Sequence, residues 1–246
     1  ARQIKLLGLS GTYVQMLTEN MPNLRGASIP YSLGYVPGPW MQSIQVSKGA
    51  SSVKNGYEST TGQIDVEFLK PQGTDGVRAN AYLDSDLKQE VNIDGFIDMR
   101  QRQQFNSMWR MAYVSPTWIS QLSIKALHDE RTSGMSHHVH HHADVELYGI
   151  EVTTNRFEAQ WKNGFTLNTE HNTSLALMIN GSIHDAENLF GKTMYDVNQK
   201  NGYAQLMFET DMAHDHNLSI GASVNHDTYS QSIELFNPIE GEEGNL

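Results

Sequence analysis

The sequence predicts a β-rich protein in two parts, a small α+β unit over residues 1–73 followed by long antiparallel strands over residues 74–246. Two observations predict this division. Apolar side chains recur at every second position from Val77 onward, which indicates strands. Prolines, in contrast, concentrate in the first part, where five of the seven lie: Pro22, Pro30, Pro37, Pro39 and Pro71. Charged residues are only 18% of the chain and glycine is plentiful at 20, which suits strands and turns better than helices.

Four short strands are expected in the first part, because short apolar runs alternate there with stretches of Gly, Pro, Ser and Asn. They are Gln3–Leu9, Val14–Thr18, Ser43–Lys48 and Gln63–Phe68. Together with their connections they predict the small α+β unit.

The second part alternates between apolar and polar positions. The longest example is Phe157–Leu167, where Phe157, Ala159, Trp161, Phe165 and Leu167 share one face. Similar rows are Val77–Leu83, Leu122–Ala126, Leu175–Ile183 and Leu218–Val224. Successive side chains of a strand point to opposite faces, so these strands predict a sheet with one polar and one apolar face.

Two kinds of protein produce this alternation. A soluble β-sandwich or lipocalin-like barrel buries the apolar face, whereas an outer-membrane barrel turns it to lipid. Strand length favours the membrane barrel, because the eleven residues Phe157–Leu167 span roughly 36 Å at ~3.3 Å each. At a tilt of ~45° they cover about 25 Å, the height of a lipid-facing band. Periodicity and length alone leave both classes open.

The connections between strands are expected to alternate in length. Short turns are predicted at Ser115–Thr117, Thr169–Asn172 and Ala213–Asn217, and long connections at about Asp129–Thr153 and His184–Asn201. Short turns on one rim and long loops on the other are typical of bacterial outer-membrane barrels. Aromatic residues near the strand ends suit interfacial girdles, although core aromatics give the same pattern: Trp109, Tyr113, Trp118, Trp161 and Phe165.

Composition excludes several classes of function. The net charge, 17 − 28 = −11, argues against a nucleic-acid partner. The absence of cysteine removes disulfides, thiolate zinc sites and cysteine nucleophiles, and leaves His, Met and carboxylates as transition-metal ligands. No nucleophile elbow, His-Glu-x-x-His motif or phosphate loop occurs, so we expect no enzyme and no required cofactor.

Membrane and targeting signals of the helical kind are also missing from the sequence. No run of about 18 apolar residues is present, so no transmembrane helix is expected. The first residues, Ala-Arg-Gln-Ile, contain neither a signal-peptide core nor an initiator Met. We therefore expect either that a leader was removed or that this is an internal piece of a longer chain.

Residues 43–70, SIQVSKGASSVKNGYESTTGQIDVEFLK, resemble the end of the plug domain of TonB-dependent outer-membrane receptors. In that family a strand leads into a KG-x-x-S-x-x-x-G turn, then a G-Q/G-x-I-x-V strand, and the barrel begins. The matching residues are Lys48, Gly49, Ser52, Gly56, Gly62, Ile64 and Val66. Upstream, Ile4–Gly26 resembles an earlier plug segment, so the resemblance covers about 70 residues in the family's order.

The resemblance implies that residues 1–73 are the C-terminal part of a plug and that residues 74–246 are the first strands of an outer-membrane β-barrel. Barrels of the family have about 22 strands, too many for this stretch, so the chain is expected to be a fragment. A strand is expected to be missing near Asp94–Gly95. Five charged plug residues are candidates for ion pairs with the barrel wall, or else ordinary solvated side chains: Glu19, Arg25, Lys48, Glu58 and Asp65.

The resemblance also implies partners and a location, the outer membrane of a Gram-negative bacterium. They are outer-membrane lipid, a small-molecule or metal substrate, a surface lipoprotein, and the TonB energy-transducing complex, whose contact segment is not in this chain. An outer membrane has no ATP or ion gradient, so the work of uptake must come from the inner membrane through TonB.

A histidine-rich segment suggests the substrate. The candidate ligands are Met135, His137, His138, His140, His141 and His142, expected in a long external loop. Closely spaced imidazoles can offer two or three nitrogens to Cu(II), Zn(II) or Ni(II), and the Met135 thioether suits Cu(I). The alternative is a solvated polar loop.

These observations predict a receptor for active uptake of a metal species, either copper or a ferric complex. Within transport, the alternative is a haem or cobalamin receptor, since His-rich loops also bind haem. From a different class, the alternative is a soluble all-β binding module whose apolar rows form a core.

Overall fold

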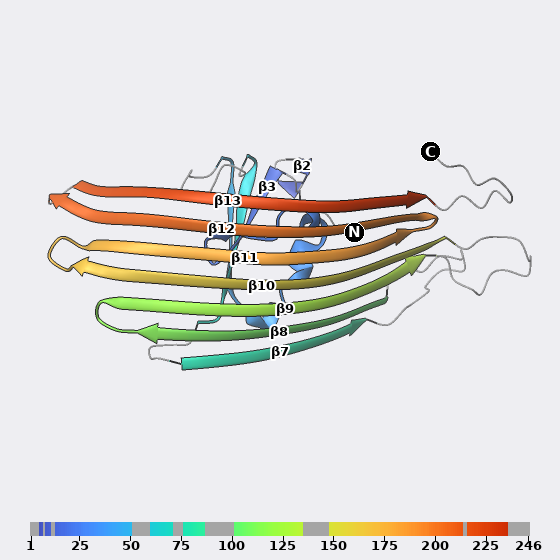
Figure 1. The fold of residues 1–246 in the computed structure, drawn as a ribbon, viewed down its shortest axis with the longest axis horizontal. Helices are drawn as coiled ribbons and strands as arrows, with labels where there is room; N and C mark the ends of the chain where they lie inside the picture. Colours follow the sequence, from blue (N-terminus) through green and yellow to red (C-terminus); the bar gives the residue numbers. More distant parts are fainter. Residues whose placement is uncertain are drawn as a thin grey trace, which may run out of the picture.

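The computed structural model describes residues 5–6, 8–10, 13–50, 60–70, 76–86, 101–134, 148–213 and 216–235. Figure 1 shows one long sheet with a smaller unit lying across one of its faces. The long sheet has seven strands, and the smaller unit contains a four-stranded sheet and a two-stranded hairpin. Within the described residues, no helix is both long enough and apolar enough to cross a membrane.

We call the seven-stranded sheet the wall. Its strands are β7 (Gly76–Asp86), β8 (Gln101–Val114), β9 (Trp118–Gly134), β10 (Gly149–Asn168), β11 (Thr173–Phe190), β12 (Thr193–Ala213) and β13 (His216–Leu235). Each strand pairs antiparallel with the next, so the order in the sheet follows the order in the chain. The predicted long antiparallel strands are therefore confirmed, and β7 and β13 are the two edges.

The turns at one end of the wall are short, as predicted. They join β8 to β9, β10 to β11 and β12 to β13, and we call this end the short-turn rim (Figure 1). At the opposite end, the far rim, the predicted long connection at His184–Asn201 is wrong. There β11 and β12 continue as strands and meet in a two-residue turn, Gly191–Lys192, in which Gly191 has φ +61°.

The long connection predicted at about Asp129–Thr153 is present between β9 and β10, but it is shorter at both ends than predicted, since β9 runs to Gly134 and β10 begins at Gly149. The reason is physical. The outward face of these strand ends carries charged side chains and the buried apolar residues Val152, Ala186 and Val197 lie on the inward face, so the outward apolar row stops although the backbone ladder continues. The proposed gap near Asp94–Gly95 lies outside the described residues.

The N-terminal unit, our name for the described part of residues 5–70, contains β3 (Val14–Thr18), β4 (Met21–Pro22), β5 (Met41–Lys48) and β6 (Gly62–Phe68). Strand β3 pairs parallel with β6, which also pairs antiparallel with β5. These agree with the predicted strands. The predicted strand Gln3–Leu9 is wrong, because β1 (Lys5–Leu6) and β2 (Leu9–Ser10) form a hairpin around Gly8, whose φ is +80°.

In the described part of residues 1–73, the helical segments of the predicted α+β unit are not α-helical. Among the described residues of the unit, the helical segments are 3₁₀ turns, η2 (Gly26–Tyr35) and η3 (Gly38–Trp40). Pro30 lies inside η2 and Pro39 inside η3. Proline lacks the backbone N–H that an α-helical ladder needs and clashes with the preceding turn, so an α-helix is disfavoured here.

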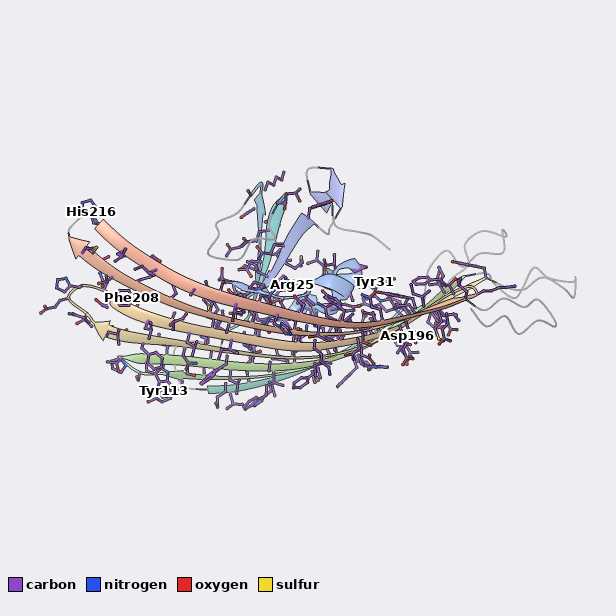
Figure 2. All side chains as sticks on the ribbon, turned by 45° about the horizontal axis from the view of Figure 1, so that its top comes forward. Arg25, Tyr31, Tyr113, Asp196, Phe208 and His216 are labelled. Carbon is purple, nitrogen blue, oxygen red and sulfur yellow. The ribbon has the colours of Figure 1, made fainter. Side chains whose placement is uncertain are left out.

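The main apolar core lies in the N-terminal unit and reaches the wall at two side chains. It includes Val14, Ile64, Val66, Phe68, Tyr35 and Trp40 from the unit and Met108 and Leu127 from the wall. Figure 2 shows that the wall is curved and that the unit lies on its concave side. The wall therefore has an inward face, which meets the unit, and an outward face.

Candidate functional site

The inward face of the wall is polar, and it contacts the N-terminal unit mainly through hydrogen bonds and ion pairs. Side chains on it that are buried include Arg110, Lys125, Arg156, Glu158, Asn180, His184, Gln199 and Asn201. They occupy the polar positions of the alternating rows, on the opposite face from the apolar positions. The candidate functional site is this unit–wall interface.

Glu19 is the first anchor of the interface. Its Oε1 accepts hydrogen bonds from Arg110 Nη2 at 3.1 Å and from the backbone N–H of Phe68 at 2.9 Å. Its Oε2 lies 3.3 Å from Lys162 Nζ, which also donates to the Glu19 carbonyl. Arg110 in turn donates to the Leu69 carbonyl at 2.9 Å. One carboxylate, only 3% exposed, thus binds two cations of the wall.

The backbone at Glu19 is strained. Glu19 and Asn20 form the two-residue turn between β3 and β4, with φ of +56° and +63°. A glutamate rarely adopts this left-handed region, whose cost is of order 1–3 kcal/mol per residue when the surroundings impose it. The turn carries the Glu19 side chain and carbonyl to Arg110 and Lys162, so the strained turn and the wall contacts belong together.

A second anchor is centred on Asn23. Its Oδ1 accepts a hydrogen bond from Arg156 Nη2 at 2.6 Å, and its Nδ2 donates to Glu158 Oε2 at 3.2 Å. On the wall, Glu158 also pairs with Arg156 at 2.9 Å and with Lys125 at 3.6 Å. All of these side chains are buried, and the amide of Asn23 joins the unit to both charges of the Arg156–Glu158 pair.

Arg25 and Gly26 make a third anchor at the opposite edge of the wall. Arg25 Nη1 lies 3.0 Å from Asp227 Oδ2 on β13. The next residue, Gly26, has φ +58° and lies so close to the wall that a Cβ there would be 2.2 Å from the Tyr229 hydroxyl. Ala27 N–H donates to Gln199 Oε1 at 3.0 Å. Glycine is needed at position 26 for both conformation and space.

The end of η2 contacts the wall nearest the far rim. The Gly34 carbonyl accepts hydrogen bonds from Arg102 at 2.6 Å and from Gln104 at 2.9 Å. The Arg131 guanidinium lies over the Tyr31 ring, 4.2 Å from its centroid. Tyr35 is hydrogen-bonded to Thr154 through its hydroxyl at 3.3 Å, and burial raises the pKa of Tyr35 to about 12.

The structure tests four of the five charged plug candidates. Glu19 and Arg25 form ion pairs with the wall, as predicted. Asp65 instead accepts a hydrogen bond from the Asn20 backbone at 3.1 Å, and burial raises its pKa. Lys48 lies exposed on β5, and Glu58 lies outside the described residues. The wall partners were not named from the sequence, although charged residues at polar positions of alternating rows were a usable signal.

The outward face of the wall is apolar near the short-turn rim. Large side chains stay exposed there on every strand, for example Leu83, Trp109, Phe157, Ile183, Leu206 and Ile220. Tyr113, Trp118 and Phe165 form a line of rings at the rim end, with centroids 5.0 and 6.1 Å apart. The Trp118 indole donates to Asn163 at 3.2 Å. In Figure 2, Tyr113 and Phe208 lie toward this rim and Asp196 toward the far rim.

The apolar band ends along an oblique line. On β8 its last apolar residue is Phe105, which pairs with His128, whereas β9 ends its apolar row at Ala126, two residues earlier. On β11 the row ends at Ile183, and on β12 at Ala204, which pairs with Ile179, four residues earlier. The outer pairs add no shift, because Leu83 pairs with Phe105 and Ala204 with Val224. Six residues over the six strand spacings of the wall correspond to about 20 Å along and ~29 Å across the sheet, a slope of roughly 35°.

The predicted metal ligands remain untested. Met135, His137, His138, His140, His141 and His142 all lie outside the described residues. Within the described part of the chain, no group of three His, Asp or Glu side chains is arranged to hold a metal ion.

Several solved structures are similar to this chain. The ferripyoverdine receptor of the outer membrane of Pseudomonas aeruginosa, bound to ferripyoverdine, matches with a TM-score of 0.63 at 12% identity, over 96% of this chain and 38% of its own. The copper transporter OprC matches with 0.57 at 12%, over 95% and 42%. The alcaligin outer-membrane receptor FauA from Bordetella pertussis matches with 0.57 at 9%, over 92% and 40%. No family model and no curated protein matches the sequence.

This likeness shows the fold. The chain has the architecture found in outer-membrane receptors and in a copper transporter, and it spans about two fifths of their length. The prediction that the chain has the fold of part of an outer-membrane receptor therefore agrees with the solved structures.

Proposed function

We propose that the chain is part of a TonB-dependent receptor in the outer membrane of a Gram-negative bacterium, which takes up a metal species, copper or a ferric complex. In this proposal residues 74–246 are strands of a transmembrane β-barrel and residues 1–73 are the C-terminal part of its plug. One observation supports it: the inward face of the wall holds a folded unit through the ion pairs of Glu19 and Arg25, while the outward face exposes an apolar band.

The apolar band has the dimensions expected for contact with lipid. On β10 it runs from Phe157 to Leu167, eleven residues, or ~36 Å along the strand. With the strands tilted by roughly 35° from the direction across the band, its height is about 30 Å, close to the ~25 Å band of outer-membrane barrels, whose strands tilt by ~35–45°. The line of Tyr113, Trp118 and Phe165 suits the interfacial girdle of such a barrel.

A soluble β module is disfavoured by the same face. Such a protein buries its apolar rows, and a monomer rarely exposes contiguous apolar patches larger than a few hundred Å². Here the buried face of the wall is the polar one, with Arg156, Glu158 and Lys125 below the unit. With the polar face buried in this way, the apolar outward face needs an apolar environment such as lipid.

The unit–wall interface suits a plug that must be displaced. Its anchors are charged and amide groups, which water can take over when the contacts open, so the cost of separation is lower than for an apolar interface of the same extent. The strained Glu19–Asn20 turn is held where its side chain meets Arg110 and Lys162. Pulling by TonB would supply the work in this proposal, and the turn would relax as its wall contacts open.

The substrate proposal has two supports. The ferripyoverdine receptor, OprC and FauA handle ferripyoverdine, copper and alcaligin respectively. The segment with Met135, His137, His138, His140, His141 and His142 carries ligands for copper. No cofactor is required in this proposal. Removing residues 137–142 should weaken copper binding measured by calorimetry, and unchanged affinity would remove the segment from the site.

Membrane placement can be tested directly because the sequence contains no cysteine. Single cysteines at Ala159 and Ala204, in the apolar band, and at Thr153, on the same outward face beyond it, can carry a nitroxide in reconstituted vesicles. We expect oxygen to relax the first two labels and a water-soluble nickel chelate to relax the third. Equal nickel accessibility at all three positions would contradict the membrane barrel.

Uptake is tested separately in cells. A deletion strain should take up less radiolabelled copper or ferric complex than its parent, and loss of TonB should reduce uptake in the parent to the same level. Growth under copper, iron and haem limitation in turn identifies the substrate. Uptake that is independent of TonB would contradict the proposal even if the nitroxides report lipid.

A further inference from the structure

Two groups of strands in the wall hold the N-terminal unit differently. We call β8–β10 the grip strands and β11–β13 the release strands. Grip-strand side chains that bind the unit through hydrogen bonds or ion pairs are Arg102, Gln104, Arg110, Arg156, Glu158 and Lys162. The apolar core of the unit reaches the wall on these strands as well, at Met108 and Leu127. Charged, amide and apolar contacts thus lie together on three neighbouring strands.

Polar side chains of the release strands bond to one another. Asn201 Nδ2 donates to Asn225 Oδ1 and to Asp227 Oδ1, both at 2.9 Å. Gln199 Nε2 donates to Asp227 Oδ1 at 3.1 Å and to the Tyr229 hydroxyl at 2.9 Å. These hydrogen bonds lie within the wall, so they can persist when the unit moves away, and the buried amides keep partners.

Several contacts between the release strands and the unit carry no charge. They are the hydrogen bonds from Asn180 Nδ2 to the Pro22 carbonyl at 2.9 Å and from the Ala27 N–H to Gln199 Oε1 at 3.0 Å, and the ring contact of His184 with Tyr35, whose centroids are 5.9 Å apart. Water can take over a neutral hydrogen bond at little net cost, because protein–water bonds replace it.

The ion pair at the release strands is more exposed than those at the grip strands. Arg25 meets Asp227 at 3.0 Å, and the Asp227 side chain is 17% exposed, against 3% for Glu19. If Arg25 leaves, Asp227 still accepts from Gln199 and Asn201. A partly solvated pair contributes little, whereas breaking a buried one leaves a charge without a partner. Separation from the release strands is therefore the easier of the two.

We propose that the unit separates from the release strands first, turning about its contacts with the grip strands, so that the substrate passes between the unit and β11–β13. The inference rests on the proposed function, because it gives the direction in which that plug opens. Amide and hydroxyl groups would line the passage, those of Ser182, Gln199 and Asn201 among them. The strained turn at Glu19, which is bound to the grip strands, would relax in a later step.

Thiol labelling can measure the order of opening, since the sequence contains no cysteine. Ser182→Cys reports on the release strands, because Ser182 lies on β11 between Asn180 and His184. Met108→Cys reports on the grip strands. The two parent side chains are 7% and 4% exposed. They belong to one cross-strand row, Met108, Lys125, Glu158, Ser182, Asn201 and Asp227.

The full receptor in phospholipid vesicles is treated with a water-soluble maleimide in urea below the unfolding transition. We expect Ser182→Cys to react at least about tenfold faster than Met108→Cys, because labelling follows the population of the locally open form. Ala112→Cys, on β8 and 6% exposed in the parent, is a second grip reporter that leaves the apolar core intact. It should react as slowly as Met108→Cys.

The ion pair at the release strands is tested in the same assay. Asp227→Asn should raise the labelling rate of Ser182→Cys severalfold and leave that of Met108→Cys unchanged. The matched control is Glu234→Gln, which also converts a carboxylate to an amide on β13 but lies exposed on the outward face. It should change neither rate.

The passage itself is tested in cells with radiolabelled copper. Two cysteine pairs are joined by dibromobimane, which fluoresces when it links two thiols: Ala27→Cys with Gln199→Cys, and Gly34→Cys with Gln104→Cys. In each parent pair a glutamine meets a backbone group of the unit, at 3.0 and 2.9 Å. The first link should abolish TonB-dependent uptake and the second should leave most of it, each relative to the same variant before linking.

Several results would overturn the inference. They are equal labelling rates at the release and grip reporters, faster labelling at the grip reporters, failure of either cysteine pair to link, and uptake that survives the first link but not the second. The labelling requires neither TonB nor a substrate. A receptor with TonB-dependent uptake but equal labelling rates therefore refutes this inference and leaves the proposed function intact, whereas ordered labelling without TonB-dependent uptake refutes the proposed function.

Discussion

Glu19 Oε1 lies 3.1 Å from Arg110 Nη2, and this contact joins the first hairpin of the four-stranded sheet to the second strand of the wall. Lys162 Nζ approaches the other oxygen of the same carboxylate at 3.3 Å. Arg110 is 5% exposed and also stacks on the Phe68 ring, 5.7 Å from its centroid. Glu19 is the one acidic partner of Arg110 among the described residues, so this buried cation depends on the Glu19 charge.

Replacing Glu19 with Gln should loosen the N-terminal unit from the wall. The amide keeps the size of the side chain but leaves Arg110 and Lys162 without their counter-charge, and breaking a buried pair in this way costs about 3–5 kcal/mol. Hydrogen exchange should report it as faster exchange in β3 and β6. The control is Glu67→Gln, whose partner Lys70 is 3.7 Å away and 40% exposed, so that exchange stays as in the parent. Equal protection in both variants would remove Glu19 as an anchor.

Tyr35 predicts a loss of stability at alkaline pH. Burial raises the pKa of its hydroxyl from 10.0 to about 12 in the folded protein. Between these two pH values the Tyr35 hydroxyl ionises in the unfolded chain but not in the folded one. The free energy of unfolding is therefore constant with respect to this group below pH 10, and it falls by about 3 kcal/mol as the pH rises to 12. In Tyr35→Phe, the free energy of unfolding measured in urea should not show this fall between pH 10 and 12. The variant should be less stable than the parent by ~1 kcal/mol below pH 10, because it lacks the hydrogen bond to Thr154.

Replacing Asp65 should stabilise the folded protein at neutral pH. Burial raises the pKa of this carboxyl, and within the described residues its Oδ2 has no hydrogen-bond partner. The folded state therefore holds its proton to a higher pH than the unfolded state, so this group favours folding at acidic pH and the advantage is lost as the pH rises through the raised pKa. Asp65→Asn should stabilise the unit at pH 7 and remove the fall in stability that the parent shows as the pH rises above the ordinary carboxyl pKa of 3.8. A variant less stable at pH 7 would show that the charge is needed.

The sequence predicted the strands best where the two faces of the wall have different surroundings, because apolar and polar side chains then alternate. Phe157, Trp161 and Leu167 point outward and Glu158 and Gln160 point inward, as the row predicted, because one face of β10 meets the N-terminal unit and the other does not. At Asp185–Asn198 the same reasoning failed. There the outward face carries charged side chains and the buried apolar residues Ala186 and Val197 lie on the inward face, so the outward apolar row is interrupted and only the ladder between β11 and β12 reveals the strands.

Only the residues that the N-terminal unit contributes to the interface could be predicted from the sequence. Glu19 and Arg25 were candidates because charged residues in a plug need partners, but Arg110 and Asp227 lie far away in sequence and are brought near by register. The left-handed turn at Glu19–Asn20 carried no signal either, since glycine is absent from it. Such pairings depend on tertiary geometry, which local pattern does not contain.

Leu122 provides a test of the medium around the wall. It lies in the outward row of β9, near the middle of the apolar band between Trp118 and Ala126. If lipid surrounds the band, Leu122→Arg places a charge near the bilayer centre and should cost about 2–4 kcal/mol. Thr132→Arg, on the same strand and face but beyond the band, should cost about 0–1 kcal/mol. Urea unfolding of each variant in phospholipid vesicles, followed by tryptophan fluorescence, measures both. If the face met water instead, both substitutions would stay within about 0.5 kcal/mol of the parent, and the wall would have to belong to a soluble protein.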